Sequence, residues 1–313
     1  MPKENNATLR TKGWEFSAAW RQKLNSAFSY YININLYDNK SVVTGYLNPV
    51  GSLTTWYEGK EEGEIWGYTA NDLYRHPEDL EYTQHVDLSF LYGGSWRTGD
   101  VKYEDTNGDG AVNNGANTID NHGDLSIIGN SMPHYEFGFS GGFSYKGIDF
   151  SMLWKGVLKR DISFDQNQNL FWGFRTYGQV TLWDRHLDYY RDQPGTKYMG
   201  LYEGEANVNL NSYFPRPYLT NADNNRNRFA STLYLQNGAY LRLQNVQLGY
   251  SISSSLLSRI KIENFRLFLS GENLLTITKL PKGIDPVAIQ GSFGMGKTYG
   301  ADRIVSFGLT ITY

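Results

Sequence analysis

The chain has 313 residues, with 29 lysines and arginines against 32 aspartates and glutamates, and a formal net charge of −3. This balance excludes a protein that binds nucleic acid through a strongly basic surface. The sequence has no cysteine, which excludes disulfide bonds and thiol chemistry. It also has no apolar run approaching the roughly 18 residues of a transmembrane helix.

The sequence instead predicts seven β-strands, because apolar and polar residues alternate with a period of two. The clearest is the last, in which every second residue is apolar and the residues between are small or polar. Leu153 is an exception to the alternation. In chain order the predicted strands are Trp14–Arg21, Phe28–Tyr37, Tyr135–Tyr145, Ile148–Lys155, Tyr240–Tyr250, Phe265–Glu272 and Val305–Tyr313.

One predicted strand changes its apolar face part-way along. Leu241 and Leu243 share one face, whereas Val246, Leu248 and Tyr250 fall on the other. One extra residue in a strand shifts the alternation in this way. We therefore expect a β-bulge near residues 244 and 245.

The connections between the predicted strands alternate between short and very long. Short turns follow the first, third and fifth strands, and long segments span roughly residues 38–134, 156–231 and 276–304. Short periplasmic turns and long outer loops are typical of a bacterial outer-membrane barrel. A soluble sandwich normally joins its strands with a few residues. We therefore expect an all-β chain that forms an antiparallel transmembrane β-barrel segment with long extracellular loops.

Six segments of the sequence resemble one known family. They are Gly63–Tyr68, Trp96–Tyr103, Asp105–Gly110, Gly123–Tyr135, Tyr240–Tyr250 and Ser270–Ile277. In this order they resemble the C-terminal barrel region of the SusC/RagA family of TonB-linked (TonB-dependent) outer-membrane transporters of Bacteroidota. The resemblance extends from about Ala7 to Tyr313.

The resemblance implies a plugged barrel of about 22 strands, to which residues 1–313 would contribute about seven. It implies an importer in the bacterial outer membrane, surrounded by lipid, that takes up oligosaccharides or peptides. The partners would be a SusD-like surface lipoprotein and the TonB complex. The chain as written contains no signal peptide, plug domain or TonB-contacting segment, so we expect a C-terminal fragment of a larger protein.

One segment of the first long loop has the composition of a calcium-binding loop. Alternate oxygen-bearing side chains followed by Gly110 match the first half of such a loop, but position 12 of that register is Ala116. Asp120 would serve there only if residues 113–118 loop out, and Asp124 is a further candidate. The predicted Ca²⁺ ligands are Asp105, Asn107, Asp109 and Asp120. The alternative is a turn that is stabilised by hydrogen bonds without metal.

Tryptophans in the first two long loops are candidate substrate-binding residues. Exposed indole rings bury a large area against sugars or peptide side chains at small entropic cost. The alternative is that they pack the loops against one another. The candidates are Trp56, Trp66, Trp96, Trp172 and Trp183.

The sequence does not predict an enzyme. Its histidines are scattered without a zinc-binding spacing, and no Gly-x-Ser-x-Gly motif occurs. Three other hypotheses remain open at this stage: a soluble secreted carbohydrate-binding β-sandwich, a small membrane-barrel enzyme, and a non-functional gene fragment. An open barrel segment has two unpaired edges, so we expect aggregation or degradation when it is made alone.

Overall fold

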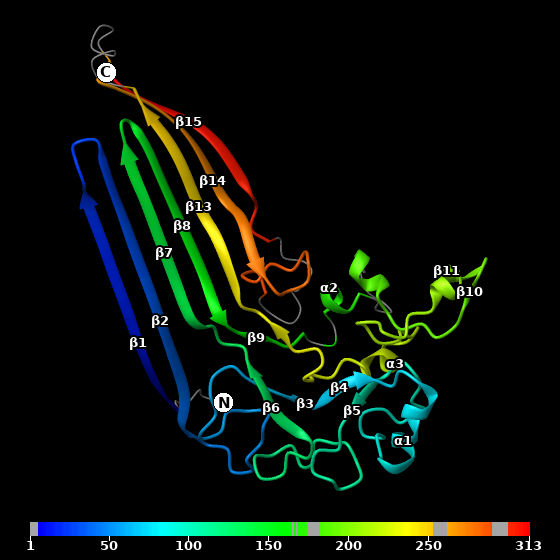
Figure 1. Ribbon diagram of the computed structural model, residues 1–313. Helices are drawn as coiled ribbons and strands as arrows, with labels where there is room; N and C mark the ends of the chain where they lie inside the picture. The colour runs from blue at the N-terminus through cyan, green and yellow to red at the C-terminus, as the bar shows by residue number, and fades with distance from the viewer. Residues whose placement is uncertain (1–5, 165, 167, 174–181, 253–261, 290–299) are drawn as a thin grey trace, which may run out of the picture.

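A computed structural model describes residues 6–164, 166, 168–173, 182–252, 262–289 and 300–313. Its main feature is one antiparallel sheet of seven strands in the order β1-β2-β7-β8-β13-β14-β15 (Figure 1). The seven predicted strands and the all-β class are confirmed. The bounds are β1 Ala7–Lys23, β2 Phe28–Tyr46, β7 His134–Tyr145, β8 Ile148–Lys159, β13 Tyr240–Ser251, β14 Asn264–Thr278 and β15 Ile304–Thr312.

The first two strands are longer than the alternation predicts. β1 begins at Ala7 and β2 continues past Tyr37 to Tyr46, because the two strands remain paired as far as Ala7 opposite Tyr46. The sequence conceals this extension, since residues 38–41 read Asp-Asn-Lys-Ser and contain no apolar residue. The first long connection therefore begins after Tyr46.

The predicted bulge is confirmed. Leu243 pairs with Trp154 of β8, and Asn245 pairs with the adjacent Leu153, so Gln244 is the extra residue. The pairing of β13 with β14 shifts at the same place. The pairings of β13 with both neighbouring strands thus contain the register shift that the change of face in the sequence indicates.

Strand register gives the sheet one apolar face and one polar face. Residues directly opposite each other in adjacent antiparallel strands lie on the same face. One apolar row runs through Trp20, Ile32, Gly141, Met152, Val246, Gly271 and Val305. A row of the opposite face runs through Arg21, Tyr31, Gly142, Ser151, Gln247, Ser270 and Ser306.

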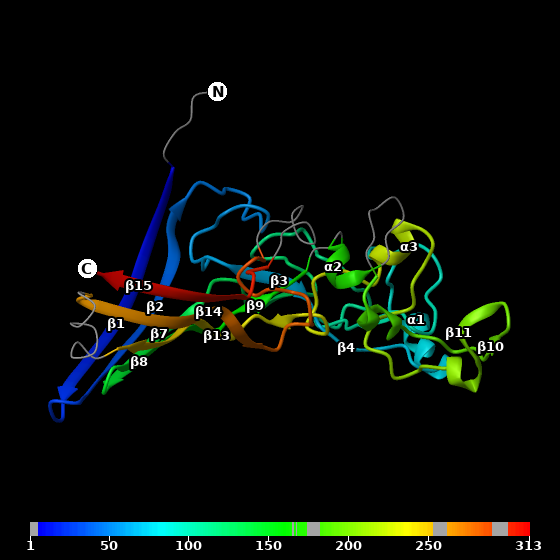
Figure 2. The ribbon, with the colours of Figure 1, turned by 90° about the horizontal axis from the view of Figure 1, so that it is seen from above.

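The apolar face is uncovered in the described part of the chain. Phe307 is 70% exposed and Trp20 60% exposed, although both belong to this face. The described parts of the long connections gather at one end of the sheet and leave its apolar face uncovered (Figures 1 and 2). Among the described residues no second layer forms a soluble sandwich, so this hypothesis is not supported. β1 and β15 stand at opposite edges, and the closure and strand number of a barrel remain predictions.

The long connections carry short elements of their own. Four two-stranded sheets pair β3 (Glu64–Tyr68) with β6 (Leu125–Asn130), β4 (Ala70–Leu73) with β5 (Val101–Tyr103), β9 (Asp161–Ile162) with β12 (Gln236–Asn237), and β10 (Gly195–Thr196) with β11 (Met199–Gly204). The helical turns are η1 (Pro77–Glu81), α1 (Tyr82–His85), α2 (Asn169–Trp172), η2 (Asp184–Leu187), η3 (Glu205–Asn207) and α3 (Asn221–Asn225). In the described residues no helix is long and apolar enough to cross a membrane.

Candidate functional site

The candidate site is the layer formed by the three long connections, here called loop A (residues 47–133), loop B (160–239) and loop C (279–303). This loop layer holds nearly all of the described hydrophobic core. Loop A supplies Tyr68, Tyr74 and Tyr103, among others, and loop B supplies Phe171 and Tyr234. Loop C adds Leu280, Ile284 and Ile289. The three loops therefore pack around a shared core and form a single layer.

Backbone hydrogen bonds join loop A directly to loop B. The Tyr68 amide donates to the Ala230 carbonyl at 2.8 Å, and the Thr232 amide donates to the Tyr68 carbonyl at 3.1 Å. The Ala70 amide donates to the Thr232 hydroxyl at 2.9 Å. These bonds extend the edge of β3 into loop B, which positions the middle of one loop against the end of the other.

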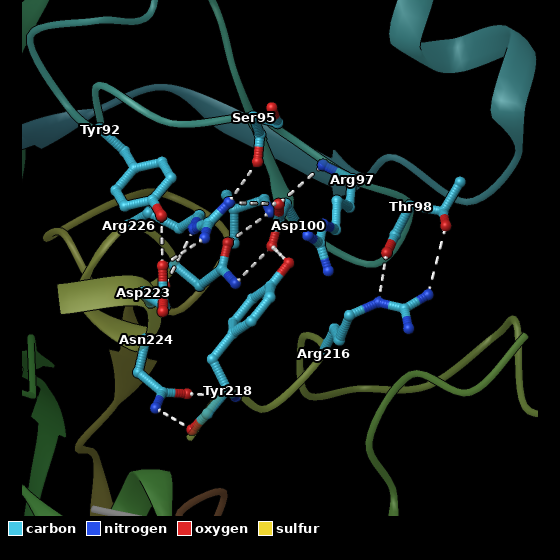
Figure 3. Close-up of polar contacts among 12 residues, drawn as sticks. Tyr92, Ser95, Arg97, Thr98, Asp100, Arg216, Tyr218, Asp223, Asn224 and Arg226 are labelled. Atoms are coloured by element: carbon cyan, nitrogen blue, oxygen red, sulfur yellow. Dashed lines mark hydrogen bonds and ion pairs between the residues drawn. The ribbon is translucent and has the colours of Figure 1, made fainter. Parts of the chain in front are cut away.

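A buried ion pair reinforces this junction (Figure 3). Nη1 of Arg226, in loop B, lies 3.3 Å from Oδ2 of Asp100, in loop A. Tyr218 donates its hydroxyl and Asn227 its side-chain amide to the other Asp100 oxygen, each at 2.8 Å. The Arg97 amide also donates to this carboxylate. Burial raises the pKa of Asp100 above its ordinary value, whereas the hydrogen bonds and the arginine oppose that shift.

Aromatic rings enclose the guanidinium of Arg226. Its central carbon lies 3.6 Å from the centre of the Tyr92 ring and 4.4 Å from that of Tyr218. Arg226 also pairs with Asp223 at 2.9 Å, and Asp223 accepts the Tyr92 hydroxyl. This cluster orders the loops and has no nucleophile or general base poised for chemistry. Sequence reasoning missed it, because Asp100 and Arg226 are 126 residues apart and belong to no common motif.

A polar pocket lies where the loop layer meets the His134 end of β7 and the Lys159 end of β8. Its volume is about 370 Å³, and its lining is Glu61, Glu64, Ile127, Ile128, Gly129, Asn130, His134, Lys159 and Asp161. Asn130 organises it, since its backbone amide donates to Asp161 and its side chain donates to Glu61, both at 3.0 Å. His134 Nδ1 lies 2.7 Å from an Asp38 oxygen. None of the five predicted tryptophans lines this pocket.

The calcium-like segment folds as a turn closed by its own backbone. Asp105 accepts the amides of Gly108 at 2.7 Å and Gly110 at 2.9 Å, and both glycines have positive φ. Asp124, which is fully buried, accepts the amides of Thr106 and Asn113. The structure thus joins the segment to Asp124 and leaves Asp120 exposed.

Metal binding by this turn remains a prediction. Across the described ranges, no three His, Cys, Asp or Glu residues are grouped so that they could hold a metal ion. The hydrogen bonds of Asn107 connect it to Asp109, whose amide it accepts at 2.9 Å. These oxygens therefore already have protein donors in this structure.

The five predicted tryptophans occupy three kinds of environment. Trp172 is 7% exposed in the core and Trp96 packs against the same core. Trp66 is partly buried, and its indole N–H donates to the Tyr57 hydroxyl at 3.3 Å. Trp56 and Trp183 are 40% and 41% exposed. The latter two present ring surface to solvent, whereas Trp172 and Trp96 pack the loops.

Comparison with known proteins identifies relatives over most of the chain. No family model matches the sequence. TonB-dependent receptor P3 of Formosa agariphila is 26% identical over 91% of this chain, and TonB-dependent receptor P26 of the same organism is 22% identical over 99%. The RagAB peptide transporter has the same fold over 98% of the chain, with a TM-score of 0.62 and 17% identity. The chain is similar to TonB-dependent receptors in sequence and to RagAB in fold.

These relatives are much longer than the chain itself. It spans 26% of receptor P3, 30% of receptor P26 and 30% of the RagAB transporter chain. Another structure of RagAB, described as a peptide importer in the open-open state, gives a TM-score of 0.61. The names of these relatives are those of receptors and a transporter.

Proposed function

We propose that this chain is part of an outer-membrane, TonB-dependent nutrient importer of the SusC type. Its sheet would form about seven strands of the barrel wall, and its loop layer would form part of the outer mouth. The observation that carries the proposal is the apolar face that continues across all seven strands. Lipid outside and water inside require this division of faces.

The height of the apolar face fits a membrane. From Phe28 to Asp38, β2 rises about 34 Å along the strand, or about 26 Å along the membrane normal at a tilt near 40°. Outer-membrane barrels have an apolar band about 25 Å tall with aromatic residues at both borders. Trp14 lies directly opposite Asp38 at one border, and Phe28 pairs with Tyr145 at the other.

The proposed topology places the loop layer outside the cell. The turns between β1 and β2 and between β7 and β8 are short and would face the periplasm, whereas loops A, B and C would face the medium. Exposed Trp56 and Trp183 would contact glycan or peptide oligomers, and a SusD-like lipoprotein would cover the loop layer. Energy would come from the TonB complex through parts outside this chain.

Cysteine labelling tests this topology: residues 1–313 contain no cysteine, and the unaltered complete protein is the control for cysteines elsewhere in it. In the complete protein expressed in its host, Tyr198→Cys lies in loop B at an 86% exposed position, and Ser26→Cys lies in the first short turn. A membrane-impermeant maleimide should label Tyr198→Cys on intact cells. It should label Ser26→Cys only after the outer membrane is permeabilised. Equal labelling of both on intact cells would contradict the proposal.

Uptake by the host tests transport itself. In-frame deletion of the gene should abolish growth on one class of oligosaccharide or peptide, and the intact gene should restore it. Trp56→Ala and Trp183→Ala together should reduce uptake without reducing the amount of receptor in the membrane. A deletion without effect on any such substrate would support the alternative, a non-functional gene fragment.

A further inference from the structure

The outer border of the apolar face carries a cluster of three cationic side chains. β1 and β2 continue beyond Trp14 toward the loop layer (Figure 1), and register places Lys12 and Arg10 on the same face as Trp14. Lys40 of β2 lies directly opposite Lys12 on this face. Arg10, Lys12 and Lys40 therefore lie on the same side of the sheet as the apolar face.

Within this cluster the charges are only partly neutralised. Lys40 pairs with Glu61 of loop A, and Asp38 on the same face accepts from His134. Arg10 and Lys12 are exposed, and no carboxylate in the described part of the chain pairs with either. Like charges directly opposite in neighbouring strands are destabilising unless a counter-charge lies between them. Glu61 supplies such a counter-charge to Lys40, so Arg10 and Lys12 are the two cations left to bind an external anion.

The depth of the cluster identifies the class of anion. Lys12 lies two residues beyond Trp14, about 7 Å along the strand and about 5 Å along the membrane normal. Arg10 lies two residues beyond Lys12, which adds the same distance again. The headgroup region of a bilayer is about 5–8 Å thick on each side of the hydrocarbon core. The Lys12 backbone thus falls in the layer where lipid phosphates lie, and the Arg10 backbone lies about 2 Å beyond it, from where its long side chain reaches back into the layer.

We infer that Arg10 and Lys12, beside the paired Lys40, form a binding site for the phosphate headgroup of an outer-leaflet lipid. The guanidinium of Arg10 would bind phosphate oxygens in a bidentate manner, and Lys12 would add a point charge. The acyl chains of the same lipid would lie along the apolar face below Trp14. The inference rests on the proposed function, because that places the apolar face against lipid.

Lipid titration of the complete purified receptor tests the site. The probes are diphosphoryl lipid A, its dephosphorylated form and inorganic phosphate, each added to receptor in neutral detergent, with thermal unfolding as the readout. Diphosphoryl lipid A should raise the unfolding temperature, and the other two should not. Each cation near an anionic lipid surface contributes about 5-fold in affinity, so Arg10→Gln/Lys12→Gln should raise the apparent Kd about 30-fold.

Lys197→Gln, at the exposed tip between β10 and β11, is the matched control and should bind like the unaltered receptor. Equal shifts for the double variant and the unaltered receptor would overturn the lipid site. So would equal shifts with dephosphorylated lipid or with inorganic phosphate. If the receptor enters the outer membrane normally in that case, the proposed function stands. A receptor recovered in the soluble fraction would overturn both.

Discussion

Arg226 and Asp100 form an ion pair from which solvent is nearly excluded, with their side chains 3% and 0% exposed. The pair joins loop B to loop A, and Tyr218 and Asn227 complete the hydrogen bonding of the carboxylate. A buried pair of this kind adds little net stability over an apolar replacement, but removing one partner is costly. The pair therefore specifies how the two loops meet.

Arg226→Met should destabilise the junction of loops A and B. The change leaves the Asp100 carboxylate buried without its cation, which typically costs about 3–5 kcal/mol. Hydrogen exchange of the complete receptor should show faster exchange at the amides of Tyr68 and Thr232, which bridge the loops. Arg97→Met is the control, because that side chain is exposed. Unchanged protection in Arg226→Met would contradict a structural role for the pair.

The loop layer should lose stability in mild acid because of His186. Its ring is buried: Nδ1 accepts the Trp183 amide at 3.0 Å, and Nε2 lies 3.1 Å from the Phe171 carbonyl. Burial, together with the charge of Arg185, lowers the pKa of His186 below its ordinary value. A lowered histidine pKa gives stability that is fully present above about pH 6.5 and is lost as pH falls through the folded-state pKa.

Proteolysis of loop B at a series of pH values measures this effect. Cleavage of the unaltered receptor should accelerate as pH falls from about 6.5 to about 5. His186→Gln should flatten the profile, since the amide can replace both hydrogen bonds without titrating. His85→Gln, at an exposed position, should leave the profile unchanged. An unaltered profile in His186→Gln would assign the acid sensitivity to other groups.

Calcium removal tests the predicted metal site. If Asp105, Asn107 and Asp109 bind Ca²⁺, about 1 mM calcium should slow hydrogen exchange in residues 105–124, and a chelator should reverse this. Asp109→Asn should then weaken the response, whereas Glu203→Gln, at an exposed acid in loop B, should not. Identical exchange with calcium and with chelator would show that hydrogen bonds stabilise the turn without metal.

The chain expressed without neighbouring sequence should aggregate. β1 and β15 each have one unpaired edge in the described sheet, and the apolar face is exposed between them. Unpaired strand edges pair with other chains, and exposed apolar area associates in water. Size-exclusion chromatography in detergent-free buffer should show material in the void volume. A monodisperse monomer there would contradict the assignment of the apolar face to lipid.

The period-two alternation of apolar and polar residues predicted most of the sheet. The faces of all seven strands and the bulge at Gln244 follow from neighbouring residues, because side chains of a strand alternate whatever lies around it. The extension of β2 past Tyr37 did not follow, since the polar residues 38–41 pair through their backbones with β1. Backbone hydrogen bonds between strands depend little on side-chain polarity, so a pattern of apolar and polar residues does not detect this extension.

Tertiary structure alone decided the loop layer. The sequence does not distinguish Trp172 from Trp183. Trp172 lies in a core shared by three loops, whereas Trp183 is partly exposed to solvent. The pairing of Asp100 with Arg226 likewise joins residues 126 positions apart. Burial of a loop residue depends on which distant segment packs against it, and no local period records that. The sequence by itself therefore determined the sheet and its two faces, and folding decided which loop residues are free to meet a ligand.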